Sequence, residues 1–258
     1  MFTVDIDPIL ISFLGFEVRY YGLIYAFGFL LALSFLLYAV KHKQLALTKQ
    51  QVYDFMFYLI LGVVIGARLF HVLFWDFFYY LNNPLKIFYL WEGGLSFHGG
   101  LVGGFLVTYF FSKKFKVSLW TLADILVVPA VFGLALGRIA NFVNQEILGT
   151  ITDKPWCVRF LRADPENCRH PIQLYAAFGR FFTFFFLLSL KKYKEGFVFW
   201  MFILLISLGR VFLDFIREDF LYFYLRVGQW FSLVLLVVTL IVLFRGYRED
   251  LRRLLHFS

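Results

Sequence analysis

The sequence contains seven runs of apolar residues that are each long enough to cross a lipid bilayer as a helix. Such a helix needs about 20 residues, because each residue advances it by about 1.5 Å. Inside the hydrocarbon only helices and closed barrels satisfy the backbone, so the runs predict an all-α polytopic membrane protein with about seven transmembrane helices. The runs are Tyr20–Val40, Phe55–Trp75, Leu95–Ser112, Leu119–Gly137, Ile172–Leu190, Gly196–Ile216 and Gly228–Phe244.

The composition supports a membrane protein, although glycine and polar residues interrupt the third and fourth runs. Of the 258 residues, 61% are hydrophobic and only 16% are charged, whereas soluble domains are about 25% charged. The net charge of +8 could indicate nucleic-acid binding in a soluble protein. Here Lys and Arg cluster between the runs, which favours a topological role and no nucleic-acid partner. No repeat or linker is visible, so we expect one domain over residues 1–258.

The basic residues predict how the chain crosses the membrane. They gather in alternate connections, and such connections face the cytoplasm. Seven spans then place the N-terminus outside and the tail 246–258 inside. We expect residues 1–17 to form an arm at the outer interface and no cleavable signal peptide, because Asp5 and Asp7 stand where basic residues are required. The basic residues are Lys41, Lys43, Lys49, Lys113, Lys114, Lys116, Lys191, Lys192, Lys194, Arg245, Arg248, Arg252 and Arg253.

Two cysteines, Cys157 and Cys168, lie in one polar connection. A disulfide is possible there if the connection faces an oxidising compartment, but cysteine pairing cannot be read from sequence alone. Their spacing is not that of a metal site, and the sequence has no glycine-rich strand–helix turn. We therefore expect neither a metal nor an organic cofactor.

The segment Gly137–Gly149 places polar residues at the end of an apolar run. Arg138, Asn141 and Glu146 are expensive at membrane depth, and such residues mark sites of chemistry or transport. A guanidinium suits a phosphate because its planar fork donates two parallel hydrogen bonds. The segment therefore indicates a place that holds an anionic lipid head group.

The predicted orientation collects polar residues from five helices in the outer half of the bilayer, which favours one site open to outer-leaflet lipid. Arg210, Asp214 and Arg217 share one helix face; they form either a structural ion-pair cluster or a place where Arg210 reaches a phosphate. His98 is either a satisfied core histidine or a general base. The collected residues are Arg19, Tyr20, Tyr21, Glu92, Ser96, His98, Arg138, Asn141, Asn144, Glu146, His170, Gln173, Arg210, Asp214 and Arg217.

Other intramembrane residues have structural interpretations. The glycines that follow His98 are spaced so that helices, or a lipid head group, can approach the backbone closely. We expect Gly62 and Gly66 to pack against a neighbouring helix. Arg68 and Asp124 are expected to have partners that the sequence does not identify.

Motifs along nearly the whole chain closely resemble the bacterial prolipoprotein diacylglyceryl transferases. They are Arg19–Leu23, Gly66–Arg68, Ser96–Gly103, Gly137–Gly149, His170–Tyr175, and Gly209-Arg210 with Arg217 downstream. The resemblance implies transfer of a diacylglyceryl group from phosphatidylglycerol to the cysteine thiol of a lipoprotein precursor peptide, in the bacterial cytoplasmic (inner) membrane. It implies that Arg138 binds the lipid, that Arg210 is essential and that His98 is a candidate base. Further substrate contacts are expected from Tyr21, Asn141, Glu146, Gly99, Gly149, Arg68 and Arg217.

The chain departs from this family's usual pattern in three places. Ala176 stands where the family usually has Glu, and Ala140 where Gly is common. Glu218 and Asp219 follow Arg217 directly, where a proline and an acid usually stand two and three positions on. These departures concern the head-group contacts near the fifth and sixth runs.

The expected reaction is alkyl transfer to sulfur, in which the thiol attacks the diacylglycerol carbon that carries the phosphate and glycerol phosphate leaves. Arg138 and Arg210 would clamp the phosphate, because preorganised charges stabilise the developing anion. His98 would help to form the nucleophilic thiolate, while Asn141 and Glu146 bind the head-group hydroxyls.

Two other classes of protein remain open. A transporter or channel would also place arginines inside a bundle, but its pathway needs polar residues in both halves of the membrane. A non-enzymatic lipid-binding scaffold would need the arginines and not His98.

Overall fold

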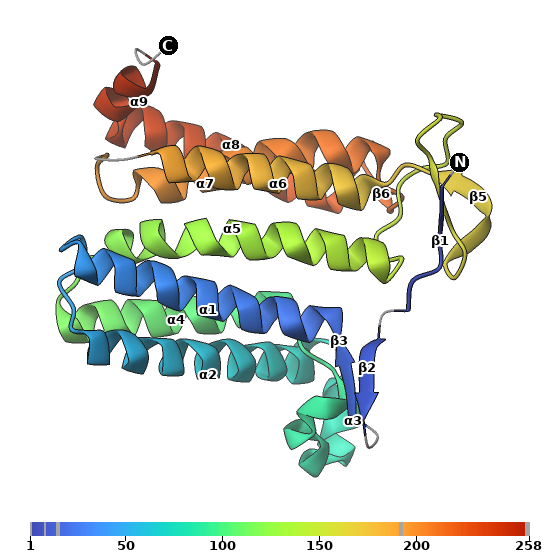
Figure 1. Ribbon diagram of the computed structural model, residues 1–258, viewed down its shortest axis with the longest axis horizontal. Coiled ribbons are helices and arrows are strands. Elements are labelled where there is room, and N and C mark those ends of the chain that lie inside the picture. Colours follow the sequence, from blue (N-terminus) through green and yellow to red (C-terminus); the bar gives the residue numbers. More distant parts are fainter. Residues whose placement is uncertain (1, 8, 14–15, 191–192, 256–258) are drawn as a thin grey trace. The chain divides into compact units, whose positions relative to one another are not determined.

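The computed structural model describes residues 2–7, 9–13, 16–190 and 193–255. Lys191, Lys192 and the last three residues lie outside this part, as do the side chains of Arg19 and Glu92. The described chain is mainly helical (Figure 1). Its long helices are α1 (Tyr20–Lys41), α2 (Lys49–Phe74), α4 (Phe97–Phe115), α5 (Leu119–Val143), α6 (Ile172–Ser189), α7 (Phe197–Leu213) and α8 (Val227–Gly246). The short ones are α3 (Phe77–Asn82), α9 (Arg248–Leu255) and the 3-10 turns η1 (Pro84–Phe88), η2 (Leu90–Glu92) and η3 (Asp214–Ile216).

Six helical stretches in the described chain are long and apolar enough to cross a membrane. They are α1, α2, α5, α6, α8 and Phe197–Ile216, which joins α7 to η3. The predicted class, an all-α polytopic membrane protein, is therefore confirmed. The third predicted run does form a helix, α4, but its glycines and basic end leave it outside the six. The number of spans and the sides of the termini remain predictions.

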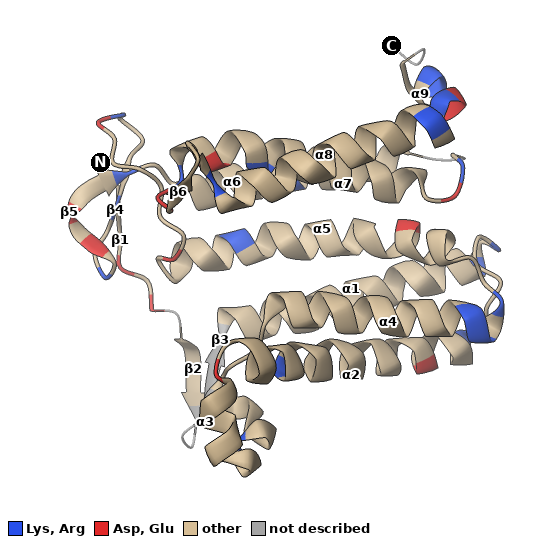
Figure 2. Cartoon of the chain, turned by 180° about the vertical axis from the view of Figure 1, so that it is seen from behind, with Lys and Arg blue, Asp and Glu red and all other residues tan. Residues whose placement is uncertain are grey.

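The chain forms two compact units, one of residues 33–122 and one that combines residues 1–32 with 123–258. Helices α2 and α4 make up half of the first unit. Each of Gly66 and Gly99 lies so close to the other's carbonyl that a Cβ could not fit. A Cβ at Gly103 would overlap the carbonyl of Gly62, and one at Gly62 would overlap the side chain of Val107 in α4. This close glycine crossing confirms the predicted packing of Gly62 and Gly66. The helices run antiparallel, so the start of α2 at Lys49 lies at the same end of the pair as the lysines that end α4. Figure 2 shows basic residues at the end of α4.

The second unit contains α6, α7 and α8 as consecutive neighbours, together with α5. Asp124 of α5 accepts hydrogen bonds from the backbone N–H groups of Gly196 and Phe199, both at 2.7 Å. These groups belong to the start of α7, whose first N–H groups have no partner within the helix. The partner of Asp124 that the sequence did not identify is therefore the N-terminus of α7.

Short strands lie at the other end of these helices. β1 (Phe2–Val4) pairs in parallel with β4 (Val158–Phe160), which pairs antiparallel with β5 (Asp164–Arg169). The disulfide Cys157–Cys168 joins the start of β4 to the end of β5 and resolves the pairing that the sequence left open. Two hairpins complete the strands: β2 (Ile9–Phe13) with β3 (Phe16–Arg19), and β6 (Leu221–Tyr222) with β7 (Leu225–Arg226).

Candidate active site

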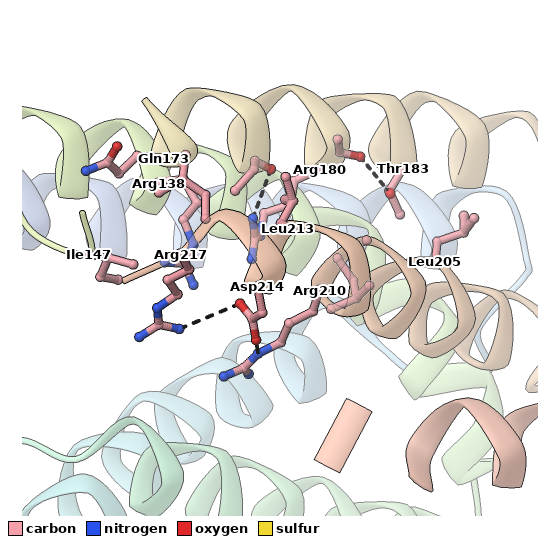
Figure 3. Close-up of a pocket in the computed structure, with 15 residues that line it drawn as sticks. Arg138, Ile147, Gln173, Arg180, Thr183, Leu205, Arg210, Leu213, Asp214 and Arg217 are labelled. Carbon is pink, nitrogen blue, oxygen red and sulfur yellow. Dashed lines mark hydrogen bonds and ion pairs between the residues drawn. The ribbon is translucent and has the colours of Figure 1, made fainter. Parts of the chain in front are cut away.

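A pocket of about 80 Å³ opens between α5, α6 and the end of α7, all within one unit. Four arginines line it, and Figure 3 shows them around the end of α7. They come from three helices: Arg138 from α5, Arg180 from α6, and Arg210 with Arg217 from the α7 end. The remaining lining residues are Ile147, Ile172, Gln173, Ala176, Gly179, Thr183, Leu205, Ile206, Gly209, Leu213 and Asp214.

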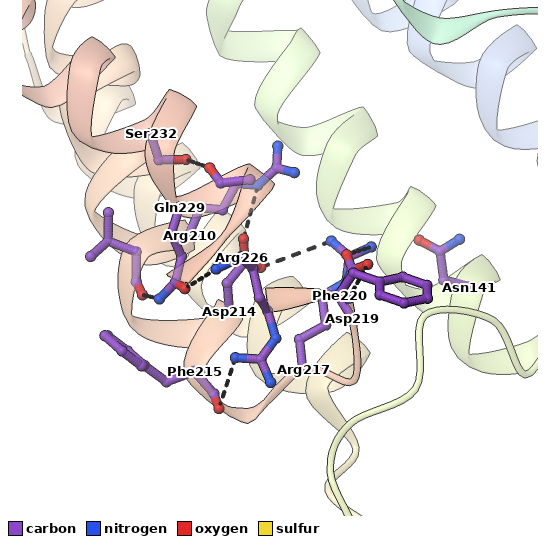
Figure 4. Close-up of polar contacts among 12 residues, drawn as sticks. Asn141, Arg210, Asp214, Phe215, Arg217, Asp219, Phe220, Arg226, Gln229 and Ser232 are labelled. Carbon is purple, nitrogen blue, oxygen red and sulfur yellow. Dashed lines mark hydrogen bonds and ion pairs between the residues drawn. The ribbon is translucent and has the colours of Figure 1, made fainter. Parts of the chain in front are cut away.

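Asp214 is the one carboxylate among the residues that line this pocket. It is 5% exposed, and it lies 3.3 Å from Nε of Arg210 and 3.9 Å from Nη1 of Arg217. Arg217 also pairs with Asp219 at 3.2 Å (Figure 4). Asp214 therefore orients two arginines at once, which agrees with the shared helix face expected from the sequence. One carboxylate against four guanidiniums leaves the pocket lining with a formal charge of +3.

Gly228 of α8 makes room for the Arg210–Asp214 pair. A Cβ built at this glycine would lie 2.6 Å from Nη2 of Arg210 and 2.7 Å from Oδ2 of Asp214. Both distances are too short for real contacts, so any side chain at this position must displace the ion pair. The sequence marked Gly228 only as the start of an apolar run, and nothing in its local pattern separates it from other glycines.

The end of α5 carries a cluster of predicted site residues. Asn141 donates to Glu146 at 3.0 Å and also to the hydroxyl of Tyr21, while that hydroxyl donates to Glu146 at 2.9 Å. Arg138 donates to Oδ1 of Asn141 at 3.3 Å, and Asn144 donates to Glu146 at 3.1 Å. The structure thus brings Tyr21, Arg138, Asn141 and Glu146 together, as the sequence predicted.

The loop after α5 pairs with the segment after α7. Gly149 bridges to Arg217, and a Cβ at this glycine would overlap the carbonyl of His170. The carbonyl of Gly149 accepts from Arg169 at 3.0 Å. Arg169 also pairs with Glu218, so one departure from the family pattern forms an ion pair here. Gly149 therefore lies beside the pocket, where its close packing holds the loop against the end of α7.

Arg169 also affects the electrostatics outside the membrane helices. Its Nε donates to Asp164, and this hydrogen bond lowers the pKa of that carboxyl below its usual value. The guanidinium of Arg169 is therefore shared between β5, the Gly149 loop and Glu218.

His98 belongs to the other unit, at the start of α4. It is exposed, stacks on Phe70, and lines a wide hollow of about 500 Å³ together with His71 and Asp76. Nε2 of His71 lies 3.0 Å from Asp76. The predicted meeting of His98 with the arginines of the first pocket remains a prediction. Gly99, the next residue, is buried in the crossing of α2 and α4.

Arg68 is held by backbone carbonyls. It is 4% exposed, and its guanidinium donates to the carbonyls of Lys86, Ile87, Tyr89, Gly93 and Gly94 at 2.5–3.3 Å. All three of its nitrogens are engaged in this way. Arg68 therefore holds the segment before α4, and the substrate contact that the sequence predicted for it remains a prediction.

Arg180 is the pocket residue that the sequence interpretation missed. The interpretation placed it in the fifth apolar run without a role. Gln173, Ala176, Arg180 and Thr183 recur at intervals of three and four residues, which puts them on one helix face. This spacing was a usable signal, because all four line the pocket.

Comparison with known proteins identifies the family. The model of the prolipoprotein diacylglyceryl transferase family matches residues 8–245. A phosphatidylglycerol–prolipoprotein diacylglyceryl transferase of Geobacter sulfurreducens is 41% identical over 83% of this chain and 83% of its own length. A protein of the same name from Aeromonas hydrophila is 36% identical over 95% and 92% of the two chains. One from Bordetella parapertussis is 38% identical over 89% and 91%.

Proposed function

The chain belongs to the prolipoprotein diacylglyceryl transferase family, and we propose that its arginine pocket binds the phosphate of phosphatidylglycerol. The protein is a multi-pass membrane enzyme that transfers the diacylglyceryl group of this lipid to prolipoproteins, a reaction of lipoprotein maturation. The observation that carries the assignment of the site is four arginines and one carboxylate around a small pocket between membrane-length helices. Charge of this kind is costly in a membrane unless an anion offsets it.

Arg138 and Arg210 serve as the phosphate clamp in this proposal. Arg210 is held by Asp214, but its side chain is still 48% exposed and can donate further hydrogen bonds. Arg138 has only an amide oxygen as a partner among the described residues. As the carbon–oxygen bond to the phosphate breaks, negative charge grows on the leaving oxygen, and both guanidiniums are already in place to stabilise it.

The cluster of Tyr21, Asn141 and Glu146 binds the glycerol hydroxyls of the head group. Glu146 is exposed, and its carboxylate oxygens accept from three side chains. A carboxylate oxygen can accept more than one hydrogen bond, so a substrate hydroxyl can join this cluster without displacing its members. Gly149 and Arg217 close the adjoining wall.

His98 assists the thiol. The precursor's sulfur forms a bond to the diacylglycerol carbon, the bond from that carbon to the phosphate oxygen breaks, and glycerol phosphate leaves with the electron pair. The thiol proton passes to His98 and then to water. This base is useful because a free thiol has a pKa of about 8.5 and is mostly protonated at neutral pH.

The precursor peptide and the lipid meet at the outer leaflet of the bacterial cytoplasmic membrane in this proposal. The support is the disulfide, which forms in oxidising compartments. It lies in the connection between α5 and α6, directly beyond the pocket end of both helices.

Replacing Arg138 tests the clamp. Arg138→Ala should lower diacylglyceryl transfer to a cysteine peptide by about 10²–10³-fold, the usual effect of losing one preorganised charge partner. The assay follows the peptide's mass gain after incubation with phosphatidylglycerol. Arg162→Ala, an exposed arginine that pairs with Asp5, is the control and should keep normal turnover. Near-normal transfer by the Arg138 variant would reject the clamp.

A pH series tests the role of His98. His98→Asn should slow transfer strongly at pH 7 and much less at pH 9, because the thiol then ionises without a base. Initial rates over this range check the prediction. A rate loss of equal size at every pH would assign His98 a structural role and leave the arginine clamp untouched.

A further inference from the structure

Arg180 is an arginine inside a membrane-length helix without a carboxylate partner in the described chain. It lies eight positions after the start of α6, which is about 12 Å along the helix. Its Nη1 donates to the carbonyl of Ala176 at 2.9 Å, and its Nε is fully buried without a hydrogen-bond partner. Leaving a buried donor unpaired is costly, and more so when it carries charge.

Arg68 shows how this chain satisfies a structural arginine. The Arg68 guanidinium donates to five backbone carbonyls and is closed off from solvent. Arg180 has one such carbonyl in the described chain, and that carbonyl belongs to its own helix, four residues earlier. The comparison argues against a purely structural role for Arg180.

The space beside Arg180 is open. Ala176, Gly179 and Gly209 line the pocket there, and a Cβ added at either glycine would meet no atom within 4 Å. The one carboxylate of the pocket, Asp214, is already engaged by Arg210 and Arg217. The unused donors of Arg180 therefore adjoin a small positive cavity whose single carboxylate is already paired with two other arginines.

We propose that Arg180 is a third anion-binding arginine, which donates to the phosphate of phosphatidylglycerol at the inner end of the pocket. The proposal rests on the proposed phosphate site and extends it by one ligand. Arg138, Arg180 and Arg210 come from three different helices, so together they surround the phosphate instead of approaching it from one side.

Kinetics of the full-length protein in phosphatidylcholine micelles test this role. Arg180→Gln should raise the KM for phosphatidylglycerol about tenfold while kcat changes less, because one charged hydrogen bond is worth about a factor of ten or more in affinity. Arg180→Lys should recover part of the affinity, since it keeps the charge and loses the fork. Arg162→Gln removes the same charge outside the pocket and should leave KM unchanged.

A second variant tests the role of Arg180 even if Arg180→Gln does not fold. Ala176→Glu places a carboxylate four residues before Arg180 on the same face, where the two can pair. It should raise KM in the natural chain. An unchanged KM in both single variants would overturn the proposal, as would an equal rise in Arg162→Gln.

Measuring which lipid the purified protein retains tests the Arg180 site independently of diacylglyceryl transfer. Native mass spectrometry of the purified protein should show phosphatidylglycerol retained over phosphatidylcholine, and Arg180→Gln should lose that preference. This result would support the Arg180 site even if the natural chain transferred no lipid. Normal transfer with unchanged retention and KM would overturn the Arg180 site alone. Inorganic phosphate that binds the natural chain and is lost in Arg180→Gln, while lipid retention stays unchanged in that variant, would show that Arg180 serves a free anion, which also overturns the lipid contact.

Discussion

At the scale of single residues, the pocket depends on a glycine as much as on its arginines. Gly228 has no functional group, yet its missing side chain is what lets Arg210 and Asp214 pair against α8. Because the atoms in the way are the side-chain ends of Arg210 and Asp214 and not backbone atoms, α8 can keep its position while the ion pair shifts to admit a methyl group. A methyl group at this position would therefore change the geometry of the site and leave the fold intact.

We expect Gly228→Ala to fold normally and to lower transfer by about a hundredfold, as small misplacements of reacting groups do. Gly133→Ala is the matched control, since a Cβ there meets no atom within 4 Å. Turnover and thermal unfolding of both variants measure the effect. Full activity in Gly228→Ala would show that Arg210 works equally well from a displaced position.

The residues of the α5 end were predictable from sequence, as was the helix face of Arg180, but the roles of Arg68 and Arg180 were not. Tyr21, Asn141 and Glu146 stand in motifs whose polarity is conspicuous in apolar surroundings. Arg68 and Arg180 are equally conspicuous, but their roles depend on which carbonyls lie near them. The carbonyls around Arg68 are 18–26 residues away along the chain. They lie in the segment before α4, whose sequence has no hydrophobic periodicity from which its fold could be predicted.

At the scale of elements, the β6–β7 hairpin presents an exposed aromatic surface. It joins the α7 end to α8, and Phe220 and Tyr224 are 90% and 95% exposed. Its turn residues, Phe223 and Tyr224, have positive φ angles of 48° and 64°, and both side chains are exposed. Aromatic residues favour the boundary between membrane and water, so we expect this hairpin to lie in that boundary.

Cysteine labelling measures the position of the hairpin. The two natural cysteines form a disulfide, so an introduced thiol stands alone. In vesicles, Tyr224→Cys should react several-fold more slowly with a charged maleimide than Asp153→Cys in the exposed loop. Detergent should remove the difference. Equal rates in vesicles would place the hairpin in water.

Helices were easier to predict than strands for a physical reason. A membrane helix is encoded by the length of an apolar run, and each predicted run overlaps one of the long helices. The β1–β4–β5 sheet has strands of only three to six residues. Pairing between residues as distant as Phe2 and Val158 leaves no local pattern in the sequence.

At the scale of the whole molecule, the number of membrane crossings determines on which sides of the membrane the termini lie. Six stretches qualify by length and composition, and α4 would be the seventh. An odd number of crossings places the termini on opposite sides, whereas an even number places them on the same side. The membrane class itself followed from composition, but the division into two compact units had no counterpart in the sequence.

Reporter fusions determine how many times the chain crosses the membrane. With seven crossings, alkaline phosphatase fused after residue 255 should be inactive, because that enzyme needs an oxidising compartment for its disulfides. The same reporter should be active when inserted at Asp153 or placed at the N-terminus. Activity at Asp153 without activity at either terminus would show that α4 does not cross.

The disulfide between Cys157 and Cys168 also has a consequence for the order in which the protein is made. In the proposed topology, this bond closes after its segment has left the reducing cytoplasm. Arg169, the next residue, holds both the Gly149 carbonyl and Glu218. The wall of the pocket is thus completed late in biogenesis. A newly inserted chain can therefore have its helices in place before the disulfide forms. The oxidation state of Cys157 and Cys168 would distinguish this immature protein from the mature one.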